Sequence, residues 1–283
     1  MATSPDFLIL RYSGSELTDE HSFHNHLVEK ISEARATRDV TYAELVYDNI
    51  APSWMANVGD ALERAKAGFC KSYNPFTLIL RVVAMPSFLH NADQIWYNRS
   101  QTQWLVSGQL TQNEFDMLYV TAYTEDYVFP DGPFAGICKS PNVAVDVENA
   151  IVPRIVVESG WSESLNELRE DAGEWLVGGN GAVQAAIIIK WTPSRTTRRV
   201  RGLVELYTLD RSGMPRLQQR EKEIFKVPPG IQPGSQAIRL TRQMFFGRSV
   251  GPGTRPGDVL PLDVGMLRAI AQVEMSKMGY SPA

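Results

Sequence analysis

The sequence predicts an α/β (α+β) protein with a mixed central sheet. Residues 154–159 and 182–191 are apolar runs of the kind that form strands covered on both faces. The segment between them, 164–178, repeats apolar residues at helical spacing. Because the connections are short, this succession indicates a βαβ unit with two parallel strands.

Composition and length limit the class of protein. The chain has 283 residues, of which 43% are hydrophobic and 21% charged, a profile typical of a soluble globular protein. Its two cysteines, Cys70 and Cys138, are too few for a disulfide framework and favour a reducing compartment. The N-terminus has no basic signal region, and apolar runs such as 76–85 fall short of the roughly 20 residues that a bilayer requires. We expect an intracellular protein, cytoplasmic or nuclear, with no membrane partner.

The first 125 residues are expected to be mostly helical. Helices are predicted at 19–38, 54–67, 88–106 and 111–123, and one β-rich run at 76–85. We therefore expect a helical N-terminal extension over residues 1–70 and a core with a C-terminal helix over residues 71–283.

The second half carries the strands of the core. Residues 143–147 and 154–159 predict a hairpin, and further strands are expected at 200–209 and within 236–246. Ser164 and Glu167 form a capping box at the start of the 164–178 helix. Asp263 is expected to cap a last amphipathic helix, Val264 to Met278.

Basic residues are concentrated in one segment. The formal net charge is −4, but residues 190–255 hold fourteen Lys or Arg against four Asp or Glu, so the segment is +10 and the rest of the chain is −14. This density can neutralise phosphates if the side chains share a face. The alternative is a solvated hairpin that balances acidic neighbours. Four arginines within seven positions are the candidates for nucleic-acid binding: Arg195, Arg198, Arg199 and Arg201.

Glu158 is the candidate catalytic acid. It ends an apolar strand just before a helix, where α/β folds place reactive groups, although it could instead be a rim glutamate paired with an arginine. Lys190 ends the next strand. If these strands are parallel neighbours, both charges emerge at one edge. With a second oxygen ligand they would form a site for Mg²⁺ or Mn²⁺ and a water directed at a phosphodiester.

One block of the sequence resembles a known superfamily. The segments are Lys139-Ser-Pro-Asn142, Pro153-Arg-Ile-Val-Val-Glu158-Ser-Gly160-Trp-Ser-Glu-Ser164, the Leu165 to Leu176 helix and Gln184-Ala-Ala-Ile-Ile-Ile-Lys190. They resemble uncharacterised fungal proteins of the PD-(D/E)XK, or restriction endonuclease-like, superfamily, and more distantly Uma2-type nucleases. The resemblance spans about residues 75–280, and residues 139–191 are its specific part. It implies a restriction endonuclease-like core and a metal-dependent nuclease activity.

The resemblance also implies roles for individual residues, with two departures. Asn142 falls at the superfamily's metal-binding Asp, Glu158 at its acidic position and Gly160 at its Lys. Asparagine is a weaker metal ligand than a carboxylate, and glycine cannot orient a water. Lys190 is the expected replacement for the missing lysine. Asp146 is the expected replacement for the missing acid, because Asn142 and Asp146 alternate onto one strand face.

Two function classes follow, together with a weaker third. The first is a metal-dependent nuclease in which Glu158, Asp146 and Asn142 hold the cation and Lys190 stabilises developing charge. The second is a pseudo-nuclease that keeps the fold for binding nucleic acid or protein without turnover. The third is an accessory protein of a small-molecule pathway, since fold does not dictate function.

Overall fold

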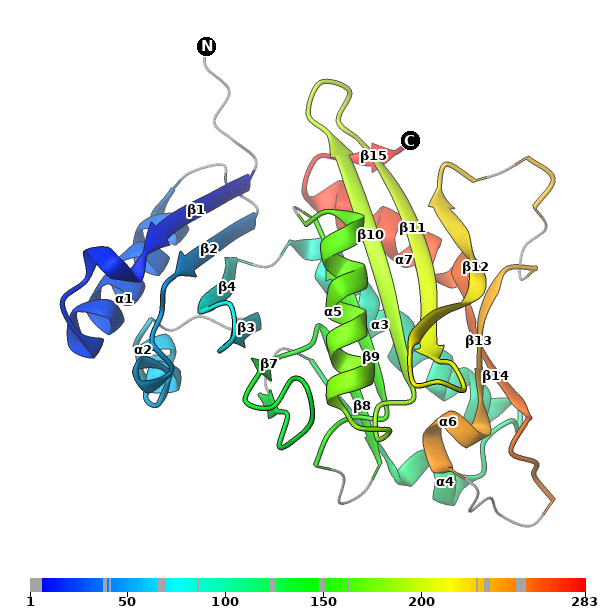
Figure 1. Cartoon of the computed structure of the whole chain (residues 1–283). Helices are drawn as coiled ribbons and strands as arrows, with labels where there is room; N and C mark the ends of the chain where they lie inside the picture. Colours follow the sequence, from blue (N-terminus) through cyan, green and yellow to red (C-terminus); the bar gives the residue numbers. More distant parts are fainter. Residues whose placement is uncertain are drawn as a thin grey trace. The chain divides into compact units, whose positions relative to one another are not determined.

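Two separate sheets divide the chain into two units (Figure 1). Unit 1 contains the described residues of Met1–Ser87, Tyr123–Pro130 and Ala135–Pro141, and unit 2 those of Phe88–Ala122, Asp131–Phe134 and Asn142–Ala283. The computed structural model describes residues 7–37, 40, 42–65, 70–85, 87–122, 126–147, 151–161, 163–227, 229–231, 235–247 and 253–283.

Unit 1 is built on a six-stranded sheet with the order β1-β2-β4-β3-β7-β6. Its helices are α1 (Glu20–Ala36) and α2 (Val58–Arg64), with short 3-10 turns at Gly14–Glu16 and Pro52–Met55. Its strands are β1 (Phe7–Ser13), β2 (Tyr42–Asp48), β3 (Cys70–Asn74), β4 (Ile79–Met85), β6 (Tyr127–Val128) and β7 (Cys138–Lys139).

The helical extension expected over residues 1–70 is wrong. Strands β1 and β2 pair in parallel over seven residues each, and α1 packs its apolar face, with Phe23, Leu27 and Ile31, into the core of this unit. Strand β2 was missed because Glu44 interrupts its apolar pattern. The fold accommodates this buried acid in an ion pair with the partly exposed Arg81, at 3.1 Å.

Unit 2 contains the sheet β12-β11-β10-β9-β8-β5, with β15 beside β11. Its strands are β5 (Leu118–Thr121), β8 (Val143–Val147), β9 (Ile155–Gly160), β10 (Ala185–Ser194), β11 (Arg199–Leu209), β12 (Pro215–Phe225) and β15 (Ser281–Pro282). A separate ribbon pairs β13 (Ala237–Thr241) with β14 (Val259–Asp263). Its helices are α3 (Phe88–Val106), α4 (Gln112–Asp116), α5 (Leu165–Gly178), α6 (Arg242–Phe246) and α7 (Val264–Lys277).

The centre of unit 2 follows the prediction. Strands β8 and β9 form the antiparallel hairpin, and β9 and β10 are parallel neighbours joined through α5. Both the Ser164 capping box and the Asp263 cap are present. In Figure 1, α5 covers one face of the sheet, and α3 and α7 lie over the other. The α/β class predicted from the sequence is therefore confirmed.

Two boundaries differ from the prediction. The helix expected over residues 111–123 ends at Asp116, and Leu118–Thr121 instead forms β5, because this aromatic and β-branched stretch pairs with β8. Residues 236–246 form β13 followed by α6 rather than one strand. Within the described residues, no helix is both long and apolar enough to cross a membrane.

Candidate functional site

Glu158 lies on the sheet face that α5 covers. Its side chain is buried, with 7% of the residue exposed, and Oε1 accepts a hydrogen bond of 2.5 Å from the indole N–H of Trp175 on α5. The next residue, Ser159, points to the opposite face because side chains alternate along a strand. There its hydroxyl accepts a hydrogen bond of 3.0 Å from the indole N–H of Trp191.

Asn142 reaches the same end of the sheet as Glu158. Val143 pairs with Val157 in the antiparallel β8–β9 ladder. Asn142, which precedes β8, therefore comes level with Glu158. The Oδ1 atom of Asn142 accepts the backbone N–H of Ser159 at 2.9 Å. The Asn142 side chain, which the resemblance predicts as a metal ligand, thus fixes the backbone of β9.

Asp146 lies toward the opposite end of β8. Four residues separate it from Asn142, which is about 13 Å along a strand. Its ladder partner is Tyr119 on β5. The alternation predicted for β8 places both side chains on one face, but the register separates Asp146 from Glu158 along the strand direction.

Lys190 shares the α5 face with Glu158 but has other partners. It pairs with Gly160 in the β9–β10 ladder, and its Nζ donates to the backbone carbonyl of Trp161 at 3.1 Å. Burial lowers the pKa of Lys190, and the nearby carboxylates of Glu163 and Glu167 partly offset this effect. The ammonium group is therefore held at the start of α5.

Asp93 on α3 is a buried acid that the sequence reasoning missed. The residue is 0% exposed, and neither carboxyl oxygen forms a well-shaped hydrogen bond with any described residue. Burial raises its pKa well above the usual value, Glu158 adds to this rise, and the nearby hydroxyl of Ser159 opposes it. The sequence does carry a signal of this burial, because Asp93 lies at helical spacing from Leu89 and Trp96, within the apolar stripe of the helix.

The predicted metal ligands do not form a set. Glu158 and Asn142 lie at one level of the sheet and both accept hydrogen bonds from the protein, while Asp146 is several residues away. No group of three His, Cys, Asp or Glu side chains in the described part of the chain is placed to hold a metal ion. The residues present at this position do not fit a Mg²⁺ or Mn²⁺ centre.

The four candidate arginines separate into two kinds. Arg198 donates to the backbone carbonyls of Met278 and Gly279 at 3.0 and 3.3 Å and stacks 4.1 Å from the ring centre of Tyr280. Arg199 and Arg201 are exposed and alternate onto one face of β11, and Arg195 is exposed in the turn before it. Three of the four thus reach the surface of the β10–β11 hairpin.

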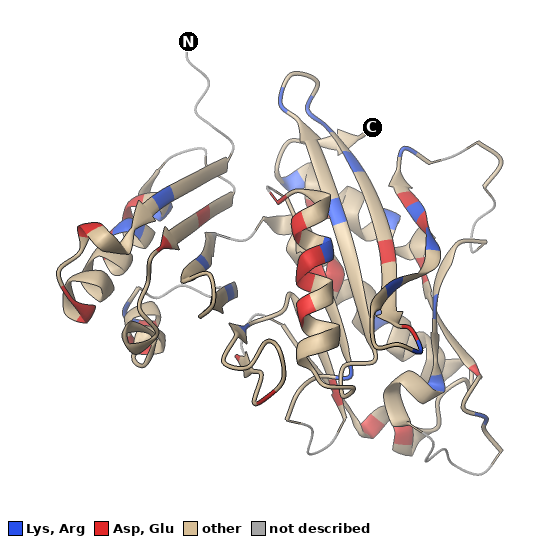
Figure 2. Cartoon of the chain, in the orientation of Figure 1, with Lys and Arg blue, Asp and Glu red and all other residues tan. Residues whose placement is uncertain are grey.

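The charges of unit 2 are separated in space. Figure 2 shows acidic residues along the exposed side of α5 and basic residues on the β10–β11 hairpin. The acids on α5 include Glu167, Glu170, Asp171 and Glu174. The basic and the acidic residues of this unit therefore lie on different elements.

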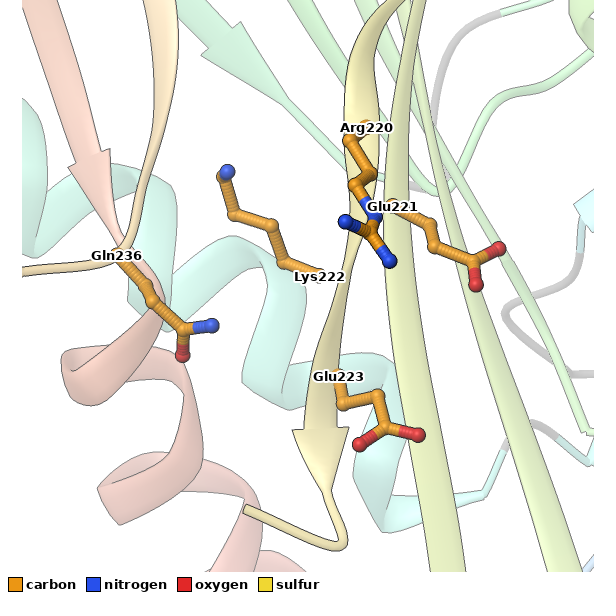
Figure 3. Close-up of a pocket in the computed structure, with 5 residues that line it drawn as sticks. All are labelled: Arg220, Glu221, Lys222, Glu223 and Gln236. Atoms are coloured by element: carbon orange, nitrogen blue, oxygen red, sulfur yellow. The ribbon is translucent and has the colours of Figure 1, made fainter. Parts of the chain in front are cut away.

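A cavity of about 460 Å³ lies beside β12 (Figure 3). Three strand spacings separate β12 from β9, which is about 14 Å. The side chain of Lys222 lies on the same side of the strand as Gln236, and the carboxylates of Glu221 and Glu223 extend to the other side (Figure 3). With Arg220 the lining has two basic and two acidic residues, so its charge favours no ion.

Comparison with known proteins found no matching family model, no matching curated protein and no matching solved structure. The resemblance to the PD-(D/E)XK superfamily stays a prediction.

Proposed function

We propose that unit 2 is a catalytically silent, restriction endonuclease-like module that binds nucleic acid through the β10–β11 hairpin. The observation that carries the absence of catalysis is the register of β8 against β9, which brings Asn142 rather than Asp146 level with Glu158. A neutral amide engaged by a backbone N–H is a poor replacement for a carboxylate as a metal ligand.

The topology supports the proposed fold. After α3, strands β5, β8 and β9 form an antiparallel succession, α5 crosses over, and β10 lies parallel to β9. This arrangement is compatible with a restriction endonuclease-like core, and Glu158 lies on β9, the apolar strand to which the sequence resemblance assigns the acid.

The hydrogen bonds at this position support a structural role for the residues that a nuclease would use in catalysis. The carboxylate of Glu158 accepts a hydrogen bond from the indole N–H of Trp175. The side chain of Asn142 accepts one from the backbone N–H of Ser159, and Lys190 donates one to the backbone carbonyl of Trp161. Each of these contacts joins a strand to a neighbouring element. The arrangement stabilises the sheet edge rather than presenting an open site to a phosphodiester.

Calorimetric titration with Mg²⁺ and Mn²⁺ tests the absence of catalysis, with the parent protein and Glu158→Ala compared. We expect no specific binding heat in either sample and no cleavage of single- or double-stranded DNA or RNA. Metal binding that Glu158→Ala abolishes, together with metal-dependent cleavage, would refute the proposal.

Fluorescence anisotropy with a labelled oligonucleotide tests the nucleic-acid contact. Replacing Arg199 and Arg201 by Glu should weaken binding and reduce the slope of log affinity against log salt by about 2, since each phosphate contact contributes about 0.9. The matched control replaces Arg211 and Arg216 by Glu, which makes the same change in net charge at two exposed residues, one in the turn between β11 and β12 and one near the start of β12. Equal effects of both changes would indicate non-specific attraction and count against the hairpin.

A further inference from the structure

Strand β1 is the outermost strand of the unit 1 sheet. It pairs with β2 along its whole length, and no strand in the described part of the chain pairs with its other edge. An exposed strand edge presents a row of backbone donors and acceptors that another strand can pair with. Most natural edge strands therefore carry features that prevent such pairing.

Several of the other outer strands have such features. In unit 1, β6 has two residues, and in unit 2, β5 has four. Strand β12 carries five charged side chains, and β14 contains Pro261. Short length, charge and proline each discourage the addition of a strand.

Strand β1 lacks these features over most of its length. It has seven residues, Phe-Leu-Ile-Leu-Arg-Tyr-Ser, with no proline, no glycine and one charged residue, Arg11. Leu8, Leu10 and Tyr12 pack at the border of the unit 1 core and remain partly exposed, while Ile9 is 39% exposed on the other face. A further strand at this edge would cover the remaining apolar surface.

We propose that β1 pairs with β1 of a second copy of this chain, antiparallel and about a two-fold axis at Leu10. In an antiparallel pair, directly opposite residues lie on the same face. The axis at Leu10 places Leu10 opposite its own copy and Leu8 opposite Tyr12 of the other copy, so the apolar faces of both cores become continuous. A shift by one residue would put these side chains on the wrong face.

The charges are compatible with this register. Arg11 of one copy lies opposite Ile9 of the other, and the two Arg11 residues lie diagonally rather than opposite each other. Each strand thus complements itself, as an isologous two-fold interface requires. This self-complementarity selects a second copy over an unrelated peptide as the occupant of the edge.

The register makes a charge-exchange test specific. Ile9→Lys puts a lysine opposite Arg11 of the other copy twice in each dimer, and like charges in opposite positions destabilise a strand pair. Ile9→Glu puts a carboxylate there instead. In sedimentation equilibrium of the full chain, we expect a dimer that Ile9→Lys weakens about tenfold or more and that Ile9→Glu preserves or strengthens. The double variant Ile9→Lys, Arg11→Glu should restore the dimer.

The control replaces an exposed apolar residue elsewhere. Val273 on α7 is 57% exposed, and Val273→Lys should leave the dimerisation constant unchanged. Thermal unfolding of each variant checks that unit 1 remains folded. A chain that stays monomeric at every accessible concentration overturns the proposal, as does a dimer that responds equally to Ile9→Lys and Ile9→Glu.

Discussion

The indole N–H of Trp175 points at Glu158 Oε1 from a distance of 2.5 Å, with both residues buried between α5 and β9. A hydrogen bond to a carboxylate is stronger than one between neutral groups. Trp175 therefore anchors the central helix of unit 2 to the strand that carries the candidate catalytic acid.

This contact predicts a measurable coupling between Glu158 and Trp175. Glu158→Ala should lower the free energy of unfolding by about 1–3 kcal/mol, because it leaves the buried indole N–H without this acceptor. Glu158→Gln retains an acceptor and should cost less. Urea unfolding of Glu158→Ala, Trp175→Phe and the double variant gives the coupling as a double-mutant cycle. A coupling near zero would remove the structural role assigned to the pair.

A side chain added at Gly160, the position where the resemblance predicts a lysine, would closely approach Leu168 and Glu163. A Cβ atom there would lie 2.8 Å from Leu168 Cδ1 and 2.9 Å from Glu163 Oε2. We predict that Gly160→Lys lowers the free energy of unfolding by about 1–3 kcal/mol through overpacking and confers no nuclease activity. Gly59→Ala is the control, since a Cβ atom at Gly59 meets nothing within 4 Å. Cleavage by Gly160→Lys would show that the site lacks only its lysine.

Asp93 predicts a pH-dependent stability. Its pKa in the folded protein is raised, chiefly by burial, so the unfolded chain loses this proton first as the pH rises above about 4. The free energy of unfolding should therefore fall as the pH increases from about 4 to the pKa that Asp93 has in the folded protein. The fall should be about 1.4 kcal/mol for each unit by which folding raises this pKa.

The variant Asp93→Asn cannot ionise and should lack this part of the pH dependence. The free energy of unfolding is measured for both proteins at pH 4 and pH 7. We expect the stability of Asp93→Asn relative to the parent protein to be greater at pH 7 than at pH 4. Parallel pH profiles for the two proteins would mean that Asp93 is ionised in the folded state.

Local signals made the βαβ unit of the core predictable. The runs that form β9 and β10 are apolar because α5 covers one face and other helices the second, and the Ser164 capping box marks where α5 begins. Strand β12 was not predictable in the same way. As an edge strand it carries five charged side chains among eleven residues, so its sequence lacks the apolar alternation of a half-buried strand.

The candidate site shows the same limit. Alternation along β8 predicts that Asn142 and Asp146 share one face, but the level at which β8 meets β9 depends on pairing between strands. The burial of Asp93 likewise arises when α3 packs on the sheet. Sequence spacing therefore identified Glu158, whereas its neighbours depend on tertiary contacts.

Arg198 and Arg199 are adjacent in sequence, but Arg199 meets Ser281 through the β11–β15 ladder, whereas Arg198 contacts the C-terminal segment with its side chain. Its guanidinium contacts the carbonyls of Met278 and Gly279 and the ring of Tyr280, which in turn packs edge-on against Trp161. We predict that Arg198→Ala lowers the free energy of unfolding by about 1–3 kcal/mol, from the lost hydrogen bonds and cation–π contact.

Arg198→Lys should restore little of this stability, because an ammonium group lacks the planar fork that donates to two carbonyls while it stacks on a ring. Arg199→Ala removes the same charge from an exposed position and should change the free energy of unfolding by less than about 0.5 kcal/mol. Chemical denaturation of the three variants separates the effects. Equal losses for Arg198→Ala and Arg199→Ala would mean that net charge, rather than the contact with Tyr280, determines the stability of this end of the sheet.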